Sequence, residues 1–229
     1  MIRVIDIETT GLDAETSAIV EIASVDMVKG GGITNAMQTF VAPGQAIPPT
    51  ASAVHHIMDE DVQGAPSLAE AIERFRGADA YVAHNAVFER SFLEASGIAY
   101  VPWLCTFKCA LRVWPEFESH NNQFLRYQLG LSAPFGIARD KISPHRAASD
   151  VIVTAAIFEK LVAAAKWSDL IAWSAAPALY TRLHFGKHRG ERYDAVDPSY
   201  LSWIVEKSDM DDGVKFSASH WLGQGRAAA

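Results

Sequence analysis

The chain has 229 residues, of which 49% are hydrophobic and 21% are charged. This composition predicts one large packed domain, or one domain with a small appendage, and excludes general disorder. The net charge of −7 has the wrong sign for a protein that binds DNA by bulk electrostatics, so any contact with nucleic acid requires a local basic surface.

The sequence gives no sign of a membrane span or a signal peptide, because apolar runs are short and the N-terminus enters a strand at once. The two cysteines, Cys105 and Cys109, are too few for a disulfide framework or a zinc site. We therefore expect reduced, structural thiols in a cytoplasmic protein that contacts no membrane.

The first expected element is a strand from Ile2 to Glu8, rich in β-branched residues. Side chains alternate along a strand, so Asp6 and Glu8 project from the same face. Two adjacent carboxylates in an apolar strand repel each other unless they share a cation, and hard oxygen ligands suit Mg²⁺ or Mn²⁺. The alternative, a surface strand with two solvated acids, is disfavoured by Ile5 and Ile7 on either side of Asp6.

The elements that follow indicate an α/β fold with a mixed sheet, because three strands precede an alternation of strands and helices. Residues 166–178 show no strong pattern and are expected to form a connector. Further strands are expected over 18–28, 37–41, 80–83 and 101–105, and helices are expected to end at Phe75, Gly97, Leu111, Gly130 and Ala164.

Two later segments add acids and a histidine to the first strand. Glu89 lies on the first turn of the helix that follows the fourth strand, and Asp150 lies five residues after His145 at the start of the last long helix. In this order and spacing the chain resembles the DEDDh family of 3′→5′ exonucleases over about residues 2–162. The segments from Cys105 to Pro115 and from Phe185 to Gly190 are similar to one member of that family.

The resemblance implies an RNase H-like fold, with a mixed five-stranded sheet flanked by helices. The exonuclease domain would span residues 1–165, the connector 166–178, and a small basic and aromatic C-terminal module 179–224.

The resemblance also implies roles for the acids. Asp6, Glu8 and Asp150 would hold one divalent ion, and Asp6 would bridge to a second ion that Glu89 supports. His145 would be the general base that takes a proton from the attacking water. We therefore expect two Mg²⁺ or Mn²⁺ ions per site, with hydrolysis of DNA from the 3′ end, on single strands or duplex ends, in a process such as DNA repair.

Helix geometry constrains His145. Residues five apart on a regular helix diverge by about 140°, so His145 and Asp150 cannot both face one site from the same helix. Pro144 and the loop before it predict that His145 lies ahead of the first turn and swings toward the site.

Glu89 departs from the family pattern, which has an aspartate at this position. A glutamate keeps the charge but adds a methylene and a rotatable bond. If Glu89 were only a solvated acid on a first helical turn, the second ion would be weakly held and catalysis slow. We expect activity to be retained.

Other residues are expected to contact the substrate. Asn85 is expected to bond the terminal nucleotide or else to satisfy the strand end, and His55 to lie near the terminal sugar, although His56 is adjacent. Leu12 would stack on the last bases, or pack on the core as a turn residue. Thr9, which follows Glu8 in the first motif, is also expected to contact the nucleic acid.

The C-terminal module has four basic residues and one acid between Arg182 and Arg192, a local balance of +3. Lys187 and Arg189 are the expected phosphate contacts, with aromatic residues interleaved. The equally weighted alternative is a small folded appendage, with its own core around Leu201 and Ile204 and a solvated basic loop.

Three functions remain open. The first is a metal-dependent 3′→5′ exodeoxyribonuclease, and the second is an exoribonuclease of the same fold, since no residue reports on the 2′-hydroxyl. The third is a nucleic-acid-binding protein whose catalysis has weakened through Glu89. The sequence does not identify protein partners.

Overall fold

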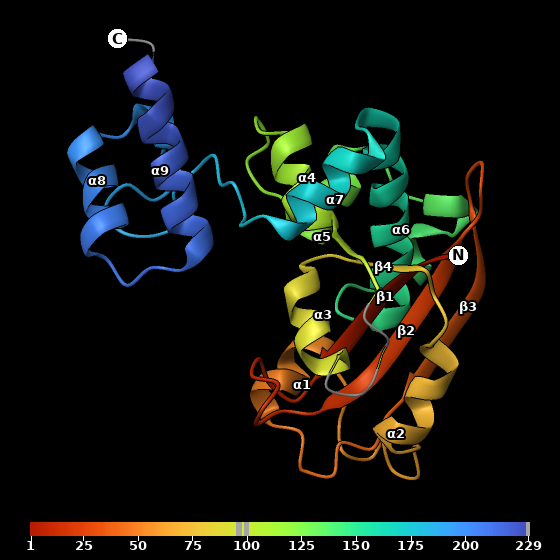
Figure 1. Ribbon diagram of the computed structural model, residues 1–229. Helices are drawn as coiled ribbons and strands as arrows, with labels where there is room; N and C mark the ends of the chain where they lie inside the picture. The colour runs from red at the N-terminus through yellow and green to blue at the C-terminus, as the bar shows by residue number, and fades with distance from the viewer. Residues whose placement is uncertain (95–97, 99–100, 228–229) are drawn as a thin grey trace.

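The computed structural model describes residues 1–94, 98 and 101–227, and its centre is a mixed five-stranded sheet (Figure 1). The strand order is β3-β2-β1-β4-β5, with β1 antiparallel to β2 and parallel to β4. The strands are β1 (Ile2–Thr9), β2 (Ile19–Met27), β3 (Ile33–Phe40), β4 (Ala80–Ala83) and β5 (Trp103–Cys105). The predicted mixed five-stranded sheet is confirmed.

Helices cover both faces of this sheet and also form a small C-terminal body. They are α1 (Pro49–His55), α2 (Leu68–Ala71), α3 (Ala86–Leu93), α4 (Thr106–Val113), α5 (Asn122–Gln128), α6 (Ala147–Ala164), α7 (Trp167–Ala175), α8 (Pro198–Lys207) and α9 (Asp212–Ala227). Short 3₁₀ turns span Ile72–Phe75, Pro134–Gly136, Arg139–Lys141 and Tyr193–Ala195. The helix end predicted at Gly97 lies outside the described residues.

Because side chains alternate along each strand, they form two core layers, one on each face of the sheet. Val4 faces the layer that contains α6, whereas Ile5 and Ile7 face the layer that contains Ile72 and Phe75. Asp6 and Glu8 therefore lie on the same face as Val4, beneath the N-terminal end of α6. The prediction that the two acids project from the same face of the strand is confirmed.

The connector differs from the prediction of a patternless segment. Residues 167–175 form helix α7, whose Leu170 is fully buried in the same core layer as Val4. A hydrogen bond from the Cys105 backbone N–H to Ser174 Oγ, at 2.8 Å, fixes this helix against β5. The sequence pattern missed α7 because tertiary packing, and not an isolated amphipathic stripe, stabilises it.

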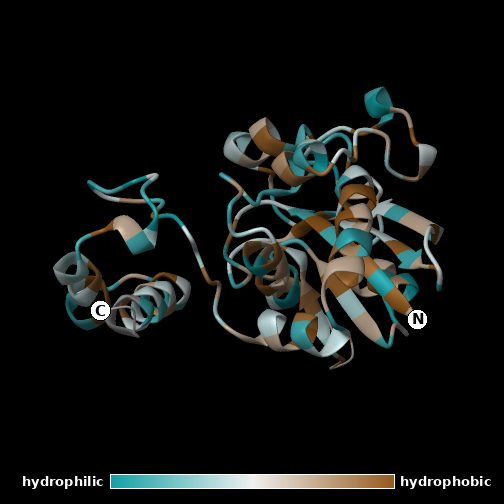
Figure 2. Cartoon of the chain, turned by 90° about the horizontal axis from the view of Figure 1, so that it is seen from above, coloured by the Kyte–Doolittle hydropathy of each residue, from teal (hydrophilic) through white to brown (hydrophobic). Residues whose placement is uncertain are grey.

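The C-terminal residues form a separate small body with its own core. Leu183, Tyr193, Leu201, Ile204 and Val214 are buried together between the loop around 183–196 and helices α8 and α9. Figure 2 shows a single segment of chain joining this body to the rest of the protein. Within the described residues, no helix has the length and apolarity that a bilayer crossing requires.

Candidate active site

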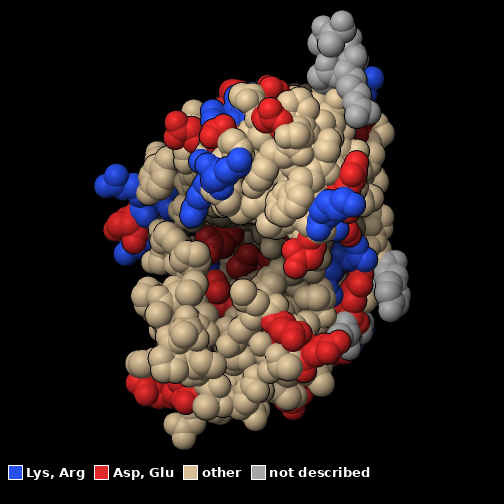
Figure 3. All heavy atoms as spheres, turned by 90° about the vertical axis from the view of Figure 1, so that its left-hand side faces the viewer, with Lys and Arg blue, Asp and Glu red and all other residues tan. Residues whose placement is uncertain are grey.

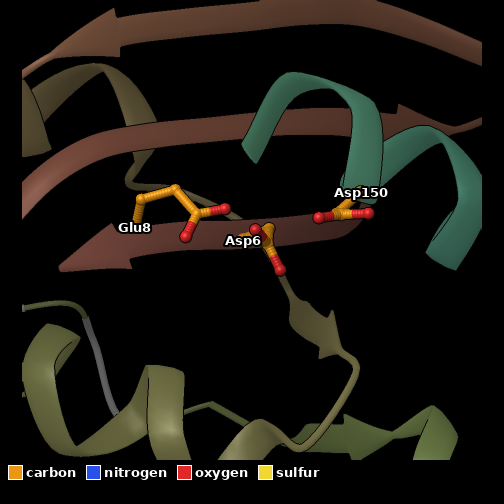
Figure 4. A group of neighbouring side chains, drawn as sticks. All are labelled: Asp6, Glu8 and Asp150. Atoms are coloured by element: carbon orange, nitrogen blue, oxygen red, sulfur yellow. The ribbon is translucent and has the colours of Figure 1, made fainter. Parts of the chain in front are cut away.

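Three carboxylates converge where β1 passes beneath α6 (Figure 4). Asp6 and Glu8 come from β1, and Asp150 comes from the first turn of α6. Each contributes one oxygen, and these oxygens all lie within 4.8 Å of one another. The sequence spacing of the first two acids and the packing of α6 thus bring together a set of hard oxygen ligands.

The ionised forms of these three carboxyl groups are destabilised, as their raised pKa values show. Burial, followed by repulsion from Asp150 and Glu21, raises the pKa of Glu8 to about 8. Burial also raises the pKa of Asp6 well above its usual range and that of Asp150 to about 6. Three crowded carboxylates with reduced hydration fit a divalent cation, which would offset most of their negative charge and replace their water.

Glu89 is not a solvated acid. It lies on the first turn of α3 with 3% of its surface exposed, and its Oε2 has no hydrogen-bond partner among the described residues. Burial and the charge of Glu8 raise its pKa to about 8, and its own charge raises the pKa of Asp6. Glu89 lies outside the compact group of three but close enough to interact with it electrostatically.

His145 lies between Pro144 and the start of α6, in a left-handed conformation with φ of 58°. Its side chain is exposed, and its backbone N–H donates to Asp150 Oδ2 at 2.8 Å. The helix begins only at Ala147, so the prediction that His145 precedes the first turn is confirmed. A histidine in this loop can change its side-chain direction without disturbing the helix.

Two supporting residues were missed by the sequence analysis. Gln123, near the start of α5, donates to Asp150 Oδ1 at 3.0 Å, so both oxygens of Asp150 are oriented. Glu21 is fully buried on β2, directly opposite Glu8 in the strand pairing. The sequence shows Glu21 only as an interruption of an apolar run.

Glu21 holds the N-terminal end of α6 against the sheet. Its two oxygens accept hydrogen bonds from Arg146 Nη2 and Nε at 3.0 and 3.1 Å, and Oε2 also accepts the Ala147 N–H at 3.0 Å. A carboxylate at a helix N-terminus also interacts favourably with the helix dipole. Arg146 in turn lowers the pKa of Glu8 and so offsets part of the increase that Glu21 causes, while the ion pair positions α6.

Three of the six residues expected to contact substrate lie around a cavity of about 450 Å³ beside Glu8. Thr9, Leu12 and His55 all line it. Leu12 is 87% exposed, so it is not packed on the core. Burial lowers the pKa of His55, whereas His56 is the exposed, left-handed C-cap of α1 and does not line this cavity.

Asn85 and the basic loop occupy other positions. Asn85 is an exposed residue with φ of 80° just before α3, and its side chain bonds no described residue. Lys187 and Arg189 are exposed on the loop of the C-terminal module, with Lys187 Nζ 5.5 Å from the centre of the Tyr200 ring. The local positive balance is smaller than the composition indicates, because Arg192 is paired with Asp194 at 2.8 Å.

Comparison with known proteins places this geometry in a family. Residues 4–158 match the RNase_T family, described as Exonuclease. Exodeoxyribonuclease 10 of Escherichia coli strain K12 is 35% identical over 230 residues, which cover 97% of this chain and 99% of that protein. A DNA polymerase III subunit epsilon-like protein of Rhodobacter capsulatus is 34% identical over 183 residues, covering 75% of this chain and 25% of that protein.

Solved structures agree with this assignment. The structure described as Exonuclease X in complex with 5′ overhanging duplex DNA has a TM-score of 0.65 and 34% identity, and the match covers 76% of this chain and 100% of that one. Escherichia coli Exonuclease I in complex with a dA16 oligonucleotide, at 15% identity and a TM-score of 0.58 over 75% of this chain and 42% of that one, shares the fold. The predicted family and RNase H-like fold are therefore confirmed: the chain belongs to the exonuclease family and is a nuclease, a hydrolase of phosphodiester bonds.

Proposed function

We propose that the protein is a 3′→5′ exonuclease that removes nucleotides from the 3′ end of DNA with two divalent cations, Mg²⁺ or Mn²⁺. The observation that carries this proposal is the convergence of Asp6, Glu8 and Asp150 oxygens within 4.8 Å of one another. The DNA substrate is supported by the relative named exodeoxyribonuclease and by the similar structure named as a complex with duplex DNA.

Asp6, Glu8 and Asp150 would hold the first cation, Asp6 would bridge to the second, and Glu89 would support the second. The orphaned, buried Oε2 of Glu89 supports a ligand role, since an unpaired buried carboxylate oxygen is costly without a cation or a donor. Bound cations would activate the attacking water and neutralise charge on the phosphoryl oxygens.

His145 would act as the general base that takes a proton from the attacking water. Its backbone is anchored to Asp150 Oδ2, while its exposed ring is free to turn toward a bound phosphodiester. The cavity beside Glu8 would receive the terminal nucleotide, with Leu12 stacking on the base and His55 and Thr9 beside the sugar. Asn85 would hydrogen-bond the same nucleotide from the start of α3.

The domain boundaries are part of the proposal. Residues 1–165, extended by helix α7, would form the exonuclease domain, and residues 179–224 a module that contacts substrate phosphates through Lys187 and Arg189. The separate core of the module supports this division. The two cysteines, both free and buried, support the expected cytoplasmic compartment.

The test uses DNA and RNA oligomers of one sequence, labelled at either end, with purified protein in Mg²⁺ or in EDTA. We expect immediate release of a labelled mononucleotide from 3′-labelled DNA and a shortening ladder from 5′-labelled DNA, both abolished by EDTA. Release from the 5′ end, or cleavage that EDTA does not affect, would contradict the proposal. Faster cleavage of the RNA oligomer would favour the exoribonuclease, and binding without cleavage would favour a protein that only binds.

A further inference from the structure

A second cavity, of about 380 Å³, lies between the catalytic domain and the C-terminal module. Its walls are largely aromatic and basic, and they come from both bodies. The lining residues that bear on its chemistry are Phe107, Phe117, His120, Tyr180, His184 and Arg189. We refer to this cavity as the interdomain cleft.

The two walls of the cleft are tied together by the chain that joins them. Lys108 Nζ donates to the carbonyl oxygens of Ser174 and Ala176, at 3.1 and 2.8 Å, so α4 fixes the end of α7 and the segment that follows it. Just beyond, the rings of Phe107 and Tyr180 lie with their centroids 6.2 Å apart. The cleft is thus bounded by defined side-chain contacts.

The cleft adjoins the carboxylate group. The His120 carbonyl oxygen accepts a hydrogen bond from His84 Nε2 at 2.9 Å, and three residues further on Gln123 contacts Asp150 at 3.0 Å. Three residues of chain span at most about 11 Å. Figure 3 shows acidic side chains at the base of a hollow in the surface, with Lys and Arg side chains close above it. The cleft and the acids are therefore close enough for one strand, with its 3′ end at the acids, to extend into the cleft.

The chemistry of the cleft suits single-stranded nucleic acid, since bases stack on aromatic rings while cations contact phosphates. Arg189 is exposed and forms no ion pair with any described residue. Arg182, also in the wall, uses Nη1 to donate to the Gly190 carbonyl oxygen, which shapes the loop that carries Arg189. Glu118 is the opposing acidic side chain of the cleft, so its charge weakens phosphate binding.

We propose that the interdomain cleft is a second nucleotide subsite, which holds single-stranded substrate upstream of the 3′ terminal nucleotide. This inference rests on the proposed function, because the terminal nucleotide must lie at the carboxylates for the strand to continue into the cleft. It assigns a substrate-binding role jointly to the catalytic domain and the module.

The test measures binding of fluorescent 3-mer and 12-mer oligothymidylates to the full chain in EDTA over a range of salt, with oligouridylates as a second series. Arg189→Ala should weaken 12-mer binding about threefold to tenfold and reduce the salt slope by about 0.7. Glu118→Lys should strengthen 12-mer binding and steepen the slope by about the same amount. Binding of the 3-mer should stay unchanged in both variants.

Matched controls separate the cleft from general charge. Glu116 is exposed two residues from Glu118, and Lys207 is exposed on the module, and neither lines the cleft. Glu116→Lys and Lys207→Ala should change the 12-mer affinity and slope by less than half as much. Equal effects in control and cleft variants, or no effect in either cleft variant, would overturn the proposal.

Photocrosslinking provides a second readout that does not require substitution. A 5-iodouracil two to four nucleotides from the 3′ end should crosslink to Phe117 or Tyr180, whereas one at the 3′ end should not. Crosslinks confined to residues 7–12 would refute the cleft subsite. These binding results stand apart from the proposed function, which fails separately if Mg²⁺ supports no release from the 3′ end.

Discussion

Replacing Glu8 by glutamine should stabilise the metal-free protein at alkaline pH. Its pKa is raised from an ordinary 4.5 to about 8, chiefly because the side chain is buried. The folded state therefore favours the protonated form more than the unfolded state does. The contribution of Glu8 to the stability of the metal-free wild type is therefore full below about pH 4.5, falls as the pH rises toward 8, and is lost above 8.

The size of the effect follows from the same two values. Each tenfold change in proton affinity corresponds to about 1.4 kcal/mol, so the ionised Glu8 destabilises the fold by at most about 5 kcal/mol. A glutamine at the same place still loses hydration as a neutral amide. We therefore expect Glu8→Gln to gain about 2 kcal/mol at pH 8, which raises Tm by about 4–8 °C in a chain of this length.

The assay is calorimetry of wild type and Glu8→Gln in EDTA at pH 5 and pH 8, with Glu60→Gln, an exposed glutamate, as control. The gain should appear at pH 8 and shrink at pH 5, where the wild-type side chain is already protonated. Saturating Mg²⁺ should reverse the order, because only the wild type then has a full ligand set. A variant no more stable than wild type at pH 8 in EDTA would refute the reasoning.

Four further predictions concern other parts of the site. His145→Ala should lower kcat about 10²- to 10⁴-fold with DNA binding nearly intact, and a rate within twofold of wild type would exclude the general base. Glu89→Asp should reach half-maximal rate at lower Mg²⁺ because the shorter acid has one less rotor to fix, and an unchanged titration would mean that the site is adapted to glutamate. Glu21→Gln should raise the Mg²⁺ concentration needed for half-maximal rate and lower Tm, since it breaks the buried ion pair that holds α6. An unchanged Mg²⁺ titration in a destabilised variant would show that Glu21 has only a structural role. Truncation after Ala178 should leave cleavage of very short oligomers intact but weaken the binding of long strands. The slope of log K against log salt should flatten by about 0.7 for each phosphate that the module no longer neutralises. An unfolded truncation product would instead show that the module has a structural role.

The parts of the site that depend on local geometry were predictable from the sequence. A period of two puts Asp6 and Glu8 on one face of β1, and the 100° turn per helical residue requires His145 to precede α6. Both statements need only the secondary structure of the segment that contains the residues. The family resemblance then supplied Asp150 and Glu89, which come from distant elements.

The parts that depend on tertiary contacts were not predictable. Glu21 is stabilised by Arg146, 125 residues away in sequence, so nothing near Glu21 indicates a partner. Helix α7 is fixed by packing of Leu170 and by Ser174, and its own pattern is weak. Composition also overstated the positive charge of the basic loop. The pairing of Arg192 with Asp194 depends on side-chain directions, which a charge count ignores.

The central claim is that the three converging carboxylates are the catalytic centre. Its most direct test is the rate of mononucleotide release from 3′-labelled DNA in saturating Mg²⁺ by Asp6→Asn and Asp150→Asn, compared with Asp140→Asn, which changes an exposed aspartate in the loop before α6. The account predicts that the rate falls at least about a thousandfold in the first two variants and stays at the wild-type value in the third. Release by Asp6→Asn or Asp150→Asn within tenfold of the wild-type rate would contradict it.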